Sequence, residues 1–222
     1  RRNLESVQQI VDLTNGLQKL SPAQPLLIAI DQEGGRVSRL PSEFTIFPPC
    51  GQLGQCNSSE LAYSAAATIA KELRAVGINM NMAPVLDVNS NPDNPVIGDR
   101  AFGAAPELVG EMGSATIGGL QDNMVVACGK HFPGHGDTAT DSHKELPVVD
   151  AGLQRLRDTE FPPFQQAIRY GVASLMTAHV LYRALDPEAP ATLSSAVIQR
   201  LLREEFRYEG VVFTDDLEMH AI

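Results

Sequence analysis

Five short apolar runs predict buried parallel strands, because their hydrophobic residues are continuous and do not alternate with polar ones. They span residues 26–30, 79–88, 125–129, 173–177 and 211–213. The segments between them carry hydrophobic residues at helical spacing, over residues 4–17, 61–76, 108–120, 153–170 and 197–206. Serine pairs precede the second and the last of these segments and are typical N-caps. The alternation predicts parallel strands joined by crossover helices.

Polar or charged residues follow every one of the five apolar runs. They are Asp31, Asp87, Lys130 with His131, His179, and Asp215 with Asp216. Functional groups at the carboxyl ends of nearly all strands are typical of a (β/α)8 barrel, whereas an open doubly wound sheet gathers them at one switch point. Gly34 and Gly35 follow a strand but lack the GxGxxG spacing of a dinucleotide site. We therefore predict an α/β fold of the (β/α)8 TIM-like barrel type.

Such a barrel needs eight strands, and only five runs are visible. The chain begins on a helix and stops just after the fifth run, so we expect the first strand and the last strands to lie outside this sequence. Repeats, low-complexity tracts and linkers of Pro, Gly and Ser are absent from the sequence. We therefore interpret residues 1–222 as one domain that forms most of a barrel.

Composition and charge exclude several classes of function. With 43% hydrophobic residues the chain can build a sizeable core, and its three cysteines form no CxxC pair, which argues against structural zinc or a disulfide framework. The net charge of −10 disfavours nucleic acid and anionic membranes as partners. No apolar stretch approaches the roughly 20 residues that span a bilayer. The first residues do not resemble a secretory signal, but a trimmed chain would look the same, so the compartment stays open.

The densest cluster of reactive residues follows the third apolar run, in a segment that Gly and Pro make irregular. Its members are Lys130, His131, His135, Asp137, Asp141 and His143. We interpret it as a loop that carries an acid/base group over a pocket, with Lys130 and His131 as ligand donors. A turn of solvated histidines is the simpler alternative. A metal site is another, because His and Asp can both ligate metals, but no HExxH-like spacing supports it, and we expect no metal.

A second candidate is the pair Asp215 and Asp216 at the end of the last apolar run. A carboxylate held at a strand end can act as a nucleophile or cap the helix that follows. Neighbouring side chains diverge on an extended backbone, so we expect one of the two residues to serve each purpose.

A third candidate surrounds the first strand end. Asp31, Arg36 and Arg39 flank the Gly34-Gly35 turn, and this mixture of acceptors and fixed donors suits sugar hydroxyls. An internal salt-bridge network among the same charges is the alternative. Arg100, after the second strand's loop, is either a ligand donor or a partner of a nearby aspartate.

The motifs IAIDQEGGRVSRL, NPVIGDRAF, GKHFPGHGDTATDSH, MTAHVLY and GVVFTDDLEM together resemble the β-N-acetylglucosaminidases of glycoside hydrolase family 3. The resemblance extends from about residue 4 to 222. The segment KHFPGHGDTATDSH is the most specific, because its Asp-Ser-His ending marks the hexosaminidase branch of the family. The resemblance implies a (β/α)8-like barrel, and we expect no cofactor.

The resemblance also assigns roles to individual residues. It implies a retaining glycosidase with Asp215 as nucleophile, His143 as general acid/base and Asp141 as its dyad partner. The residues implied to hold the sugar are Asp31, Arg39, Arg100, Lys130 and His131. A retaining mechanism needs a carboxylate that forms a glycosyl ester and an acid that protonates the leaving oxygen. An aspartate beside a histidine favours the protonated ring that such an acid requires.

We therefore expect a small carbohydrate substrate that ends in N-acetylglucosamine, such as a peptidoglycan-derived fragment. The alternatives are a broader exo-β-glycosidase, a glycoside phosphorylase, or a sugar-binding protein without turnover. The family's usual setting is cell-wall recycling in the bacterial cytoplasm, although some members are exported. The sequence does not indicate an oligomeric state.

Overall fold

The computed structural model of the protein describes residues 3–140 and 145–222. Over these residues a single larger sheet contains five strands, all parallel, in the order β1-β2-β3-β5-β7. They are β1 (Ala29–Ile30), β2 (Met80–Asn81), β3 (Val126–Phe132), β5 (Ser174–Thr177) and β7 (Val211–Thr214). A short parallel pair, β4 (Val148–Val149) and β6 (Leu181–Tyr182), lies beyond the carboxyl end of the sheet.

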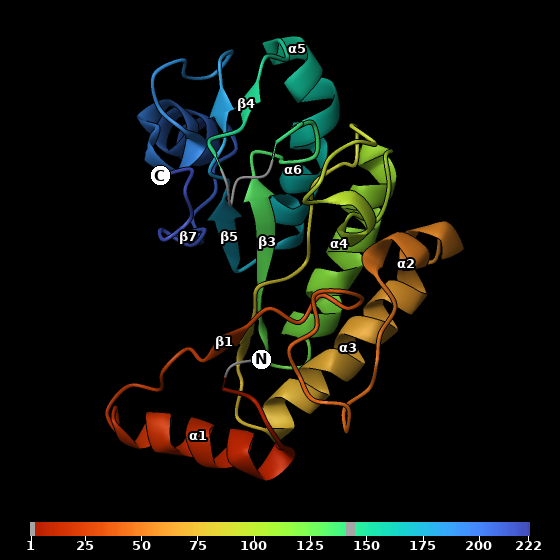
Figure 1. Cartoon of the computed structure of the whole chain (residues 1–222), viewed down its shortest axis with the longest axis vertical. Helices are drawn as coiled ribbons and strands as arrows, with labels where there is room; N and C mark the ends of the chain where they lie inside the picture. Colours follow the sequence, from red (N-terminus) through yellow and green to blue (C-terminus); the bar gives the residue numbers. More distant parts are fainter. Residues whose placement is uncertain (1–2, 141–144) are drawn as a thin grey trace.

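One helix precedes β1, and the others lie between strands of the main sheet, as crossover helices do. They are α1 (Val7–Lys19), α2 (Cys50–Cys56), α3 (Ser59–Ala75), α4 (Pro106–Gln121), α5 (Leu153–Arg155) and α6 (Phe161–Tyr170). Short 3-10 turns occupy Gly98–Arg100 and Ala191–Leu193, and π-helical segments occupy Leu156–Glu160 and Ala196–Glu205. Figure 1 shows α3, α4 and α6 packed side by side along one side of the sheet, as the outer layer of a barrel would be. Among the described helices, none combines the length and the apolar character that crossing a membrane requires.

Local sequence signals place the helix ends. The Ser58 hydroxyl accepts a hydrogen bond from the Leu61 amide at 3.3 Å, and so caps α3. The Ser194 hydroxyl accepts from the Val197 amide at 3.2 Å where the last helical segment begins. A proline opens α4, where the missing N–H costs nothing. Gly171, with φ of 91°, ends α6 in a left-handed conformation that glycine adopts freely.

The predicted α/β class with a barrel-type parallel sheet is confirmed, and the curled sheet forms half of such a barrel. All five predicted strands exist, but the run at 79–88 is not one continuous strand. Only Met80–Asn81 pairs regularly, and Val85 forms a single bridge to Lys130. Pro84 lies between them and has no N–H to donate to a ladder. The hydrophobic pattern did not predict α2 or the β4–β6 pair.

Candidate active site

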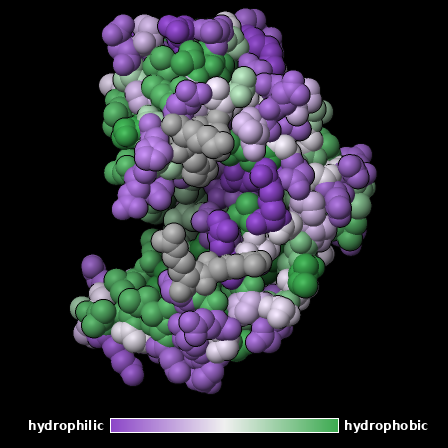
Figure 2. All heavy atoms as spheres, viewed as in Figure 1, coloured by the Kyte–Doolittle hydropathy of each residue, from purple (hydrophilic) through white to green (hydrophobic). Residues whose placement is uncertain are grey.

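A cavity of about 420 Å³ opens at the carboxyl ends of the parallel strands. Hydrophilic side chains gather in the hollow near the middle of the face drawn in Figure 2. Its polar lining comes from the ends of β1, β3 and β7 and from the loop after β2. The charged and histidine residues in this lining are Asp31, Glu33, Arg36, Arg39, Arg100, Lys130, His131, His135, Asp215 and Asp216.

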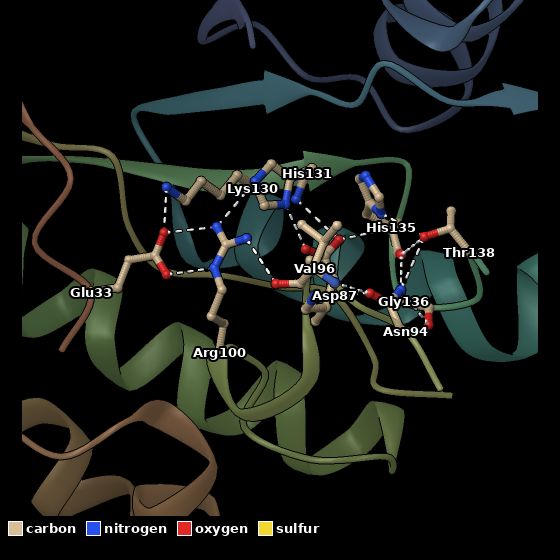
Figure 3. Close-up of polar contacts among 12 residues, drawn as sticks. Glu33, Asp87, Asn94, Val96, Arg100, Lys130, His131, His135, Gly136 and Thr138 are labelled. Carbon is tan, nitrogen blue, oxygen red and sulfur yellow. Dashed lines mark hydrogen bonds and ion pairs between the residues drawn. The ribbon is translucent and has the colours of Figure 1, made fainter. Parts of the chain in front are cut away.

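Buried ion pairs organise one wall of this cavity. Lys130 Nζ lies 2.6 Å from Glu33 Oε1 and 2.8 Å from Asp31 Oδ1. Arg100 binds the same Glu33 carboxylate in a bidentate way, with its Nε 2.9 Å from Oε2 and its Nη2 3.0 Å from Oε1. Figure 3 shows Glu33 facing both cations at once. One carboxylate therefore fixes two positively charged side chains beside the cavity.

The charges in this cluster are mutually stabilised. Burial raises the pKa of Glu33, but the charges of Lys130 and Arg100 and their hydrogen bonds outweigh it and bring the pKa down to about 2. Burial lowers the pKa of Lys130, but the carboxylates of Glu33 and Asp31 outweigh it and raise the pKa above its ordinary value. Glu33, Lys130 and Arg100 are therefore ionised at neutral pH. Asp31 is the more exposed acid, with a side chain 42% accessible, and so is available to a ligand.

The histidine loop, residues 131–138, is held by the loops that follow β2. The buried Asp87 carboxylate contacts the His131 ring at 2.7 Å and accepts from the amides of His131 and His135. The Asn94 side-chain amide donates to the carbonyl oxygens of His135 and Gly136. A side chain at Gly136 would collide with the Val88 carbonyl, so the two loops can approach this closely only with glycine there.

His135 is a structural member of this loop. Its ring lies edge-on to that of His131, and its Nδ1 is 2.9 Å from the Thr138 hydroxyl. Burial, together with the neighbouring His131, lowers the pKa of His135 to about 4. The ring is therefore uncharged at neutral pH.

The two aspartates after β7 differ in their surroundings. Asp215 Oδ1 accepts from the Asp216 amide at 2.8 Å, while Asp216 Oδ1 accepts from the Glu218 amide in the turn that follows. The Asp216 carbonyl also contacts His179 Nε2 at 3.0 Å, so the buried His179 supports this turn. Burial raises the pKa of Asp215, but His131, the Asp216 amide and Lys130 outweigh it and lower the pKa. Asp215 is therefore an ionised carboxylate at the cavity.

The structure brings together most of the predicted site residues. Asp31, Arg39, Arg100, Lys130, His131 and Asp215 all line the cavity. Asp141 and His143 lie outside the described residues. Sequence reasoning missed Glu33 as the shared partner of the two cations, and Asn94 as a support of the histidine loop. The motifs IAIDQEGGRVSRL and NPVIGDRAF contain Glu33 and Asn94, but the partners of these two residues lie 67 and 41 residues away along the chain.

Three comparisons relate this chain to known proteins. The model of the glycosyl hydrolase family 3 N-terminal domain matches residues 1–222. A β-hexosaminidase of Nitrosomonas eutropha is 41% identical over 226 residues, which cover 99% of this chain and 64% of that relative. A second β-hexosaminidase, of Hydrogenovibrio crunogenus, is 39% identical over 226 residues, which cover 99% of this chain and 62% of that relative. The chain thus spans slightly under two thirds of the length of these relatives.

Two solved structures are similar over nearly the entire chain. A glycoside hydrolase family 3 β-N-acetylglucosaminidase from Paenibacillus sp. superimposes with a TM-score of 0.98 and 52% identity, covering 100% of this chain and 43% of that one. NagZ from Neisseria gonorrhoeae, in complex with N-trifluoroacetyl-D-glucosamine, superimposes with a TM-score of 0.91 and 37% identity. That match covers 97% of this chain and 65% of the NagZ chain.

Proposed function

Because this chain belongs to glycosyl hydrolase family 3, we propose that it forms the N-terminal catalytic domain of a retaining exo-β-N-acetylglucosaminidase. The enzyme removes N-acetylglucosamine from the non-reducing end of β-linked substrates. The observation that carries this proposal is the convergence of an ionised carboxylate, Asp215, with sugar-binding candidates from three other strand ends on one cavity.

The proposed chemistry begins with Asp215. Its carboxylate attacks the anomeric carbon of the bound sugar and forms a glycosyl ester while the bond to the leaving oxygen breaks. In this proposal His143 donates the proton to that oxygen, and Asp141 orients the His143 ring. Water then attacks the ester, and His143 accepts a proton from that water, which returns the ring to its starting form and frees Asp215. The lowered pKa of Asp215 supports the first step, because a nucleophile must be unprotonated.

The other cavity residues hold the sugar. Lys130 and Arg100 offer N–H donors and the partly exposed Asp31 offers an acceptor, which together match hydroxyl groups that both donate and accept. Glu33 fixes both cations before a substrate arrives. The two side chains therefore lose little further conformational entropy when the sugar binds. Arg39 lines the cavity beside Asp31 and adds a further donor.

The N-acetylated substrate is proposed from the relatives. Two curated relatives are named β-hexosaminidases, and a similar NagZ structure contains an N-acylated glucosamine. Fragments of peptidoglycan carry N-acetylglucosamine at non-reducing ends and fit this chemistry.

The test compares nitrophenyl β-N-acetylglucosaminide with the matching β-glucoside, each with and without phosphate. We expect faster turnover of the N-acetylglucosaminide and free N-acetylglucosamine as the product in both buffers. Faster turnover of the glucoside would overturn the specificity. A sugar phosphate formed in the phosphate buffer would identify a phosphorylase, and binding without turnover would identify a sugar-binding protein.

A further inference from the structure

Asp87 places three hydrogen-bond donors around one completely buried carboxylate. Oδ1 accepts from the amides of His131 and His135 at 3.1 and 2.7 Å, and Oδ2 lies 2.7 Å from Nδ1 of the His131 ring. A carboxylate that receives several N–H donors is favoured in its charged form. Burial raises the pKa of Asp87, but the contacts with His131 and His135 outweigh it and lower the pKa. Asp87 is therefore an acceptor only, and the proton between it and His131 resides on Nδ1.

The opposite nitrogen of His131 faces a cation. Nη2 of Arg100 lies 3.5 Å from His131 Nε2, and Figure 3 shows the guanidinium between the Glu33 carboxylate and the His131 ring. A guanidinium has no lone pair to offer, so this contact is a hydrogen bond only if Nε2 accepts.

Among the residues that the structure describes, Asp87 is the acceptor that faces Nδ1 of His131. His135 packs edge-on at 5.7 Å between ring centroids and is uncharged. Lys130 precedes His131 and is directed to Glu33 and Asp31. Asp215 lines the same cavity.

We propose that Asp87 is a positioning residue that keeps a single proton on His131 Nδ1 and so presents Nε2 to the substrate as a hydrogen-bond acceptor. Arg100 Nη2, at 3.5 Å, is placed to donate to this lone pair. When substrate binds, a sugar hydroxyl donates to it instead. This use of Nε2 rests on the proposed function, whereas the position of the proton is a property of the protein without substrate.

The substitution Asp87→Asn separates this role from a purely structural one. The two backbone amides on Oδ1 orient the asparagine so that its carbonyl oxygen replaces Oδ1 and its NH₂ group replaces Oδ2. Both backbone hydrogen bonds are kept. The NH₂ group, however, now donates to Nδ1, so the ring proton must move to Nε2 and the acceptor becomes a donor.

The experiment measures two-bond ¹H–¹⁵N correlation spectra of histidine-labelled protein without substrate, with the His131 signals assigned from a His131→Gln variant. We expect the Nδ1–H tautomer in the wild type and the Nε2–H tautomer in Asp87→Asn. An Nε2–H or doubly protonated ring in the wild type at neutral pH would overturn the proposal, and this measurement needs no variant to fold. An unchanged tautomer in folded Asp87→Asn would overturn it as well.

Kinetics test the substrate contact separately. On nitrophenyl β-N-acetylglucosaminide, we expect kcat/KM of Asp87→Asn to fall at least about 10-fold, as the loss of a buried hydrogen bond does. The control is Asp122→Asn, which changes an exposed carboxylate at the end of α4 and should leave the rate unchanged. If the tautomer shifts in Asp87→Asn but kcat/KM does not change, then Nε2 of His131 does not accept a hydrogen bond from the substrate. A protein that hydrolyses no glycoside would contradict the proposed function, while the spectra would still decide the position of the proton.

Discussion

The ammonium group of Lys130 lies 2.6 Å from Oε1 of Glu33, and both side chains are almost completely withdrawn from solvent, at 3% and 2% exposure. Arg100 shares the same carboxylate. Desolvating three charges is costly, and the cost is offset only while each charge keeps its partner. A substitution that removes one charge of this cluster therefore leaves its partners buried without an opposite charge.

We predict that Glu33→Gln lowers the free energy of unfolding by about 3–5 kcal/mol at pH 7, as breaking a buried ion pair does. The pKa of Glu33 is lowered in the fold, so its charged form contributes stability above the ordinary pKa of 4.5. That contribution is lost as the pH falls through about 2. The difference in the free energy of unfolding between wild type and Glu33→Gln should accordingly become smaller in acid. Urea unfolding at several pH values measures it.

A surface ion pair in the same chain provides the control. Arg36 and Asp99 form an equally direct contact at 3.0 Å, but about half of each side chain is exposed. Asp99→Asn should cost no more than about 1 kcal/mol. Equal losses in the two variants would mean that burial does not strengthen the Glu33 cluster.

A second prediction concerns Glu160, a buried acid under the histidine loop. Its Oε1 meets Ser90 at 3.2 Å and Arg155 at 3.4 Å, while its Oε2 has no hydrogen-bond partner among the described residues. Burial raises its pKa from 4.5 to about 7, opposed by Arg155 and reinforced by the charges of Asp87 and Asp137. A raised pKa means that the protonated form stabilises the fold below about pH 4.5. This contribution is lost as the pH rises through about 7.

We expect Glu160→Gln to remove this dependence, because an amide does not ionise. At about 1.4 kcal/mol per pKa unit, the free energy of unfolding of the variant should rise by about 3 kcal/mol relative to that of the wild type between pH 4.5 and 8. The measurement is the free energy of unfolding in urea across that range. Asp158→Asn changes an exposed acid of the same π-helical segment and should show no such gain. Parallel pH profiles of wild type and Glu160→Gln would contradict the prediction.

The sequence predicted the parts of the fold that depend on local patterns. Continuous apolar runs and capping serines located every strand of the main sheet and most helices, because burial and capping act over a few residues. The run at 79–88 was predicted too long, since its pairing is interrupted at Pro84. The π-helical segments at 156–160 and 196–205 were read as ordinary helix, because hydrophobic spacing barely distinguishes the two.

The site was predictable only as a set of strand ends. Parallel strands carry their carboxyl ends to one edge, so Asp31, Lys130 and Asp215 could be expected to meet. The ion pair of Glu33 with Arg100 could not, because it joins residues 67 positions apart through tertiary packing. The same holds for the contact of Asp87 with His131 across 44 positions. The proposed acid, His143, lies outside the described residues, and its role stays a prediction.

A third prediction is that catalysis needs no metal. Within residues 3–140 and 145–222, no three His, Cys, Asp or Glu side chains are grouped so as to hold a metal ion. The Nδ1 atoms of His131 and His135 are already engaged by Asp87 and Thr138. Dialysis against a chelator should leave kcat and KM unchanged, with metal content followed by mass spectrometry. Zinc bound one to one, with activity lost on its removal and restored on its return, would contradict this.

The last prediction is that Asp215, and not Asp216, forms the covalent bond to the sugar. Asp215 is the lowered-pKa carboxylate at the cavity, while Asp216 Oδ1 is used by the Glu218 amide in the following turn. A 2-fluoro sugar that slows breakdown of the intermediate should therefore leave its label on Asp215, as peptide mapping by mass spectrometry will detect. Label on Asp216 would show the assignment wrong.

Kinetics of three variants complete this test. Asp215→Ala should lower kcat at least about 1,000-fold on every substrate, because no other group can form the ester. Asp216→Ala removes the acceptor of the Glu218 amide and leaves Asp215 in place, so its loss of kcat should be far smaller. His143→Ala should slow poor leaving groups strongly and nitrophenyl leaving groups little, because nitrophenolate departs without a proton. If Asp215→Ala and His143→Ala lost the same factor on good and poor leaving groups, the two residues would not divide the chemistry into nucleophile and acid.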